Sequence, residues 1–131
     1  MKKVGILLLF ISLFHLSFKS FAQNKQVETP SLQVIQFHLE HRCISCLKIE
    51  KFTKASLTKY FPSVPFELVN VEEKKNAKKA EDFHASGTAL FLYNPKTGKK
   101  KDLTASAFMN VGDEAKFEAE LKKAIEEFIK S

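Results

Sequence analysis

Two cysteines, Cys43 and Cys46, are the residues whose type and spacing most clearly indicate chemistry. They are the only cysteines of the 131-residue chain, and they stand where an apolar, strand-like run gives way to a helix-like one. In the first turn of a helix, such a pair can close a disulfide, whose Cα atoms usually lie about 4.4–6.8 Å apart. The same two sulfurs could instead share a metal ion.

A position at the start of a helix favours a reactive thiolate at Cys43. Unpaired backbone N–H groups and the positive end of the helix dipole both stabilise a thiolate there. Arg42 adds a fixed positive charge, and His41 could add another when protonated. We therefore expect Cys43 to be the attacking nucleophile, Arg42 to stabilise its thiolate and a more buried Cys46 to be the resolving cysteine.

Two other uses of the pair stay open on the sequence. Cys43, Cys46 and His41 could supply three ligands to Zn²⁺ or Cu⁺, and His38 or Met109 could complete such a site. An inert disulfide could also pin the helix start, although a four-residue loop makes a weak staple. We expect reversible redox use without a metal or other cofactor, with thiolate-based binding of a soft metal or metalloid as the alternative.

The first 22 residues have the pattern of a secretory signal peptide. Lys2 and Lys3 precede an apolar run over 4–16, and the small residues Ser20 and Ala22 follow it. This pattern predicts cleavage after Ala22 and a mature protein that is periplasmic or secreted. An oxidising compartment of that kind permits stable disulfides.

An uncleaved membrane anchor is the alternative for this segment. Its most apolar part, Val4–Phe14, would span only about 16 Å as a helix, well short of a hydrocarbon core of about 30 Å. We therefore expect a mature protein that does not span the membrane. Residues 23–31 are polar and include Pro30, which predicts a flexible leader before one domain over 32–131.

Charge gives little indication of the partner. The chain carries 21 lysines and arginines against 15 acidic residues, and three of the lysines belong to the signal segment. The remaining excess is modest, and no nucleic-acid-binding motif is present. We expect a monomer that acts on a protein redox partner and does not bind nucleic acid.

The pattern from residue 32 onward predicts an α/β domain in the order β-α-β-α-β-β-α. The expected strands cover 32–39, 66–71, 88–93 and 99–103, and the expected helices run from the cysteines to about 61, within 72–84 and from Asp113 onward. Helices between the first three strands predict right-handed crossovers and a central mixed sheet with helices on both faces. The stretch 105–111 is expected to be irregular, with Phe108 and Met109 either packed or exposed to a partner.

This order, with CxxC opening the first helix, resembles the thioredoxin fold over roughly 32–130. Three segments are similar, more closely, to the small exported thioredoxin-like proteins of the ArsF family, labelled nitrophenyl-compound nitroreductase subunits. They are His41–Cys46 with Ile49-Glu50, the turn Asn94–Lys100, and Asp102–Thr104 before Ala107-Phe108. The resemblance implies thiol–disulfide exchange with electron supply to a larger reductase. A reducing role in an oxidising compartment would also require a membrane electron donor.

The chain departs from thioredoxin around the cysteines. Arg42 stands where thioredoxins have tryptophan, and Ile44-Ser45 replaces Gly-Pro. The buried acid that thioredoxins carry six residues before the first cysteine falls on Phe37. Without this acid, the chain lacks the group that relays a proton through water to the second cysteine in thioredoxins, which corresponds to Cys46.

A second departure concerns the loop that faces the disulfide in thioredoxins. The resemblance places a cis-proline there, and this chain has Thr88, or Ala89 if the alignment shifts by one residue. Because a cis bond before a non-proline residue costs about 2.5–4 kcal/mol, we expect Gly87–Thr88 to be trans. Substrate peptides lie across this loop in the family, so an altered loop favours docking to one dedicated partner.

Overall fold

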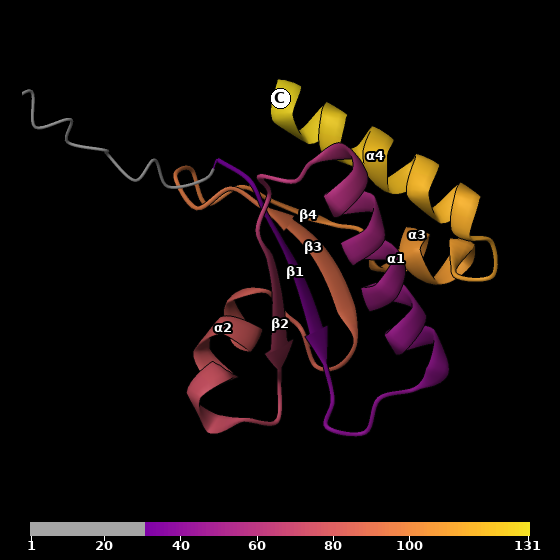
Figure 1. Ribbon diagram of the computed structural model, residues 1–131. Coiled ribbons are helices and arrows are strands. Elements are labelled where there is room, and N and C mark those ends of the chain that lie inside the picture. Colours follow the sequence, from indigo (N-terminus) through magenta and orange to yellow (C-terminus); the bar gives the residue numbers. More distant parts are fainter. Residues whose placement is uncertain (1–30) are drawn as a thin grey trace, which may run out of the picture.

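The computed structural model describes residues 31–131, so the predicted signal peptide and nearly all of the predicted leader lie outside the described residues. A mixed four-stranded sheet forms the centre (Figure 1). Its strands are β1 (Gln33–His38), β2 (Phe66–Asn70), β3 (Ala89–Tyr93) and β4 (Lys100–Asp102), in the order β2-β1-β3-β4. β1 is parallel to β2 and antiparallel to β3, which is antiparallel to β4. The α/β class is confirmed, and the arrangement is compatible with a thioredoxin-like fold.

Helices cover both faces of this sheet, as expected (Figure 1). On one face lie α1 (Ile44–Tyr60), α3 (Thr104–Asn110) and α4 (Glu114–Lys130), and on the other lie η1 (Lys74–Asn76) and α2 (Ala77–Asp82). Asp113 caps α4, since its side chain accepts a hydrogen bond from the Lys116 N–H. This confirms the predicted start of the last helix.

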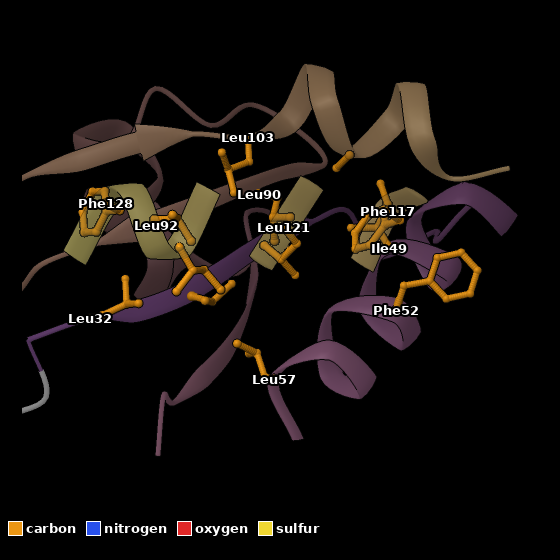
Figure 2. Packing of buried hydrophobic residues seen from close by; sticks show 13 residues of the cluster. Leu32, Ile49, Phe52, Leu57, Leu90, Leu92, Leu103, Phe117, Leu121 and Phe128 are labelled. Atoms are coloured by element: carbon orange, nitrogen blue, oxygen red, sulfur yellow. The ribbon is translucent and has the colours of Figure 1, made fainter. Parts of the chain in front are cut away.

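Alternation along β1 divides the buried side chains between two clusters. Val34 belongs to a larger cluster on the side of α1 and α4, whereas Ile35 and Phe37 belong to a smaller one on the side of α2. Figure 2 shows the larger cluster, which joins the sheet to both long helices. Within it, the rings of Phe52 and Phe117 meet at 5.6 Å between centroids and tie α1 to α4.

The right-handed crossover expected between the second and third strands is wrong, because β3 runs antiparallel to β1. β2 ends at Asn70 beside His38, and β3 begins at Ala89 beside Phe37, so the chain stays at one end of the sheet. The six residues of α2 span only about 9 Å, too little to return along a five-residue strand of about 17 Å. This short connection brings the start of β3 to the same edge as the start of α1.

Two segments differ from their expected form. The stretch expected to be irregular contains α3, whose first residue Thr104 donates its N–H to Asp102 Oδ1 at 2.8 Å. Burial of Ala107 against the larger cluster stabilises this short helix, which leaves Met109 80 % exposed. The helix expected within 72–84 is shorter than predicted and is split into η1 and α2, since only Ala80 of α2 is buried.

Within residues 31–131, no helix is long and apolar enough to cross a membrane.

Candidate redox site

Cys43 and Cys46 form a disulfide at the start of α1, as the spacing predicted. Their Cα atoms lie 5.2 Å apart. Cys43 is the N-cap of the helix, with an extended backbone, and its Sγ accepts a hydrogen bond from the Cys46 N–H at 3.3 Å. The sulfur of Cys43 therefore occupies the place that a capping oxygen usually takes, where backbone donors favour negative charge.

The two sulfur-bearing residues differ sharply in exposure. Cys43 is exposed, whereas Cys46 is only 5 % exposed and faces the body of the protein. The exposed apolar side chains of Ile44 and Leu47 flank the pair on the first turns of α1. A second molecule can approach Cys43, while Cys46 is accessible chiefly from Cys43 itself.

Thr88 lies against the buried cysteine. Its Oγ1 is 3.0 Å from the Sγ of Cys46, in the loop just before β3. All peptide bonds within residues 31–131 are trans, so the expected trans Gly87–Thr88 bond is confirmed. Ala89, the other residue considered for this position, packs instead against the smaller cluster on the opposite face of the sheet.

Gln36 is a part of the site that the spacing of motifs does not reveal. This residue of β1 is fully buried, and its Nε2 donates a hydrogen bond to the backbone oxygen of Cys46 at 2.9 Å. Its Oε1 has no hydrogen-bond partner among the described residues. A polar residue within an apolar strand is the available signal, but only the fold shows that it faces α1.

Arg42 is paired with a carboxylate. Its Nη1 contacts Glu50, two turns further along α1, and the same carboxylate contacts Lys54. Burial raises the pKa of Glu50, but hydrogen bonds from Lys54 and Arg42 outweigh it, so this pKa lies below its usual value. The negative charge of Glu50 therefore offsets part of the positive charge that Arg42 brings to Cys43, and no motif in the sequence marks Glu50 for this role.

The loop before Cys43 is fastened to the end of β2. Asn70 donates from its side chain to Glu40 at 2.6 Å, and its Oδ1 accepts the N–H of Glu72 at 3.0 Å. The N–H of Val71 also donates to the oxygen of His38 at 2.9 Å. These bonds fix the path of the chain into the N-cap of α1.

The residues of the alternative metal site, Cys43, Cys46 and His41, do not form a group that could hold a metal ion in the described part of the chain. His41 is exposed, and the Nδ1 of His38 donates to the oxygen of Leu39 at 2.9 Å. In the described part of the chain, no three histidine, cysteine or acidic side chains are grouped so as to hold a metal ion.

Comparisons with protein-family models, with curated proteins and with solved structures found no match to this chain.

Proposed function

We propose that this chain is an exported, thioredoxin-like thiol–disulfide oxidoreductase or electron-transfer subunit that works through Cys43 and Cys46. The observation that carries this proposal is the unequal pair: an exposed Cys43 at a helix N-cap is bonded to a buried Cys46. An attacking and a resolving cysteine need this difference. The partner must have access to the attacking sulfur, whereas the resolving cysteine reacts only with the attacking one.

The exchange balances as follows. With the pair reduced, the Cys43 thiolate attacks a partner disulfide, a bond forms between Cys43 and one partner sulfur, and the other partner sulfur leaves as a thiolate. The Cys46 thiolate then attacks the Cys43 sulfur and releases the second partner thiolate. The partner gains two electrons and the cysteine pair becomes a disulfide. The reverse sequence oxidises the partner, and the pair itself is the redox group.

A single dedicated protein partner fits the site better than general exchange with unfolded chains. The loop facing the disulfide carries Thr88 and a trans peptide bond instead of the cis-proline on which thioredoxin-like proteins lay peptide substrates. By its resemblance to the ArsF family, the partner would be a larger reductase. A reducing role in an oxidising compartment would require a membrane electron donor as well.

The first test is a redox titration. The protein is purified without chelator from a host that exports it, equilibrated in glutathione or dithiothreitol buffers, alkylated, and read by intact mass, which also reports cleavage after Ala22. We expect a reversible two-thiol transition above roughly −270 mV. A pair that stays oxidised well below about −300 mV would be structural, and thiols shielded from alkylation by a retained metal would indicate a metal-binding protein; either result overturns the proposal.

A trapping experiment separates the roles of the two cysteines. With a reactive aromatic disulfide as the probe, a Cys46→Ser variant should accumulate a mixed disulfide at Cys43, because no resolving thiol remains. The matched Cys43→Ser variant should react at least about tenfold more slowly, because its remaining thiol is buried. Equal reactivity of the two variants would contradict the assignment.

A further inference from the structure

The contact between Thr88 and Cys46 joins a hydroxyl group to the buried member of the pair. Its 3.0 Å separation is well within hydrogen-bonding range for a sulfur atom. Thr88 reaches this position because β3 begins beside the end of β1, next to the first turn of α1. The antiparallel placement of β3 thus brings the Thr88 hydroxyl to the first turn of α1.

Among the described residues, Thr88 is the only side chain outside the disulfide that hydrogen-bonds to the Sγ of Cys46. Gln36 binds the backbone oxygen of Cys46, and the Cys46 N–H is directed to Cys43. Arg42, the cationic residue next to Cys43 in the sequence, contacts Glu50, and no hydrogen bond joins it to the Sγ of Cys46. Any stabilisation of charge on this buried sulfur by a hydrogen bond from another side chain therefore falls to Thr88.

A hydrogen bond from a hydroxyl to sulfur differs in strength between the disulfide and the reduced pair. A disulfide sulfur is a weak acceptor, whereas a thiolate is a charged one, and hydrogen bonds to charged groups are about twice as strong as neutral ones. Burial makes the difference larger, because a charged sulfur with little access to water depends on protein donors. The same contact therefore favours the reduced pair over the disulfide.

We propose that Thr88 is a catalytic residue that stabilises Cys46 as a thiolate whenever the bond between the cysteines breaks, an inference that rests on the proposed exchange. When a thiolate attacks Cys43, its bond to Cys43 forms and the Cys43–Cys46 bond breaks. The electron pair of that bond stays on the Sγ of Cys46, and the Thr88 hydroxyl donates a hydrogen bond to it. A proton from solvent can neutralise the thiolate afterwards, and no further reactant is needed.

The stabilisation of the Cys46 thiolate depends on the hydroxyl group of Thr88. A proline at the same place, as the resemblance would supply, has no side-chain donor. The replacement of proline by Thr88 thus changes which state of the pair is favoured, in addition to changing the loop. It raises the reduction potential relative to a site of the same shape without the hydroxyl.

The test compares Thr88→Val with Thr88→Ser in the full chain, because valine keeps the branched shape and serine keeps the hydroxyl. Against glutathione, we expect the equilibrium constant of Thr88→Val to shift about tenfold toward the disulfide, equal to about 30 mV. Reduction of its disulfide by dithiothreitol should slow by a similar factor. Thr88→Ser should restore most of both values.

Thr53→Val is the matched control. Thr53 lies on α1, the helix that carries Cys46; it is fully buried, and its hydroxyl has no hydrogen-bond partner among the described residues. The same loss of a buried hydroxyl there should leave the equilibrium with glutathione unchanged. Thermal unfolding of each variant checks that the fold is retained, and Thr88→Ala takes the place of Thr88→Val if the latter fails to fold.

Two results would overturn the inference while leaving the proposed function intact. In the first, the wild-type pair exchanges reversibly and Thr88→Val has the same equilibrium constant and rate. In the second, serine and valine shift both values equally, which would mean that side-chain shape and not the hydroxyl matters. A wild-type pair that does not exchange at all would remove both proposals together.

Discussion

Arg42 and Glu50 bring opposite charges to the first turns of α1, close in sequence to the exposed Cys43. Their ion pair means that the effect of each charge on the Cys43 thiolate is partly cancelled by the other. Removing either residue exposes the effect of the one that stays. Two opposite charges near Cys43 can thus be changed separately by substitution, and only Arg42 is next to the cysteine in the sequence.

Opposite shifts are therefore expected from Arg42→Ala and Glu50→Gln. In the reduced protein, the pH midpoint for alkylation of Cys43 should rise in Arg42→Ala and fall in Glu50→Gln, each by about 0.3–1 pH unit, as expected for a unit charge near the surface. Rapid alkylation across a pH series, read by mass, measures both. Shifts of the same sign would mean that loss of the ion pair disturbs the site structurally and would contradict an electrostatic role.

Glu50 should also make the stability depend on acid pH. Its pKa in the folded state lies below the usual value of 4.5, so the stabilisation is fully present above the unfolded-state pKa and is lost as pH falls through the folded one. We expect Glu50→Gln to lower the free energy of unfolding by about 1–2 kcal/mol at pH 7, and the gap to wild type to close as pH falls below 4.5. Urea denaturation at pH 7 and pH 3 measures it, and Glu81→Gln, at an exposed position, should show no gap. A gap that is as large at pH 3 as at pH 7 would exclude ionisation as its cause.

At the residue level, the pattern of the sequence indicated the pair that bonds but not the groups around it. Cys43 and Cys46 lie three positions apart in the sequence, so their spacing within a helical turn was enough to predict the bond. Gln36, Glu50 and Thr88 reach the site through strand order, helix periodicity and loop path together. Of these, only Thr88 could be anticipated, and only through the resemblance.

The elements on the two faces of the sheet are held very unequally. α4 buries four large side chains in the larger cluster, whereas α2 has six residues and buries only Ala80, with Phe83 just after it. Local opening costs less for an element with few buried contacts. The layer formed by η1 and α2 is therefore expected to open without unfolding the rest.

Hydrogen exchange can show this difference. Amides bonded within α2, such as that of Phe83, should exchange at least about tenfold faster than amides near Leu121 in α4. Exchange followed by NMR at neutral pH gives both rates in one experiment. Equal protection would mean that α2 belongs to the same cooperative unit as α4.

Helices and strands with a strong apolar pattern could be predicted from the sequence. The direction of a strand could not be predicted where it depends on the length of the preceding helix. The short, apolar and partly β-branched run of β1 and the apolar stripe of α4 identified both correctly. The direction of β3 could not be read from the order of elements, because it depends on how far the short α2 can carry the chain. α3 was missed because only two of its residues, Ala107 and Asn110, are buried, and of these only Ala107 is apolar and contacts the core.

On the scale of the whole molecule, the sheet separates a large, well-packed side from a small one. The cysteine pair lies at the start of α1, on the large side (Figure 1). α1 is anchored along its length by Ile49, Phe52 and Leu57. The pair is thus mounted on one of the most firmly held elements. In the proposed exchange, this anchoring would keep Cys46 close to Cys43 while a partner is bound.

We expect the groups that contact the two cysteines to stay in place when the bond between the sulfurs opens. The amide of Cys46 binds Cys43, and Thr88 and Gln36 bind Cys46, so little in the surface needs to move on reduction. We expect the oxidised and reduced proteins to present nearly the same outline. The outline alone would then not distinguish the two forms for a partner, and the share of unproductive encounters would follow the proportion of the two forms in solution.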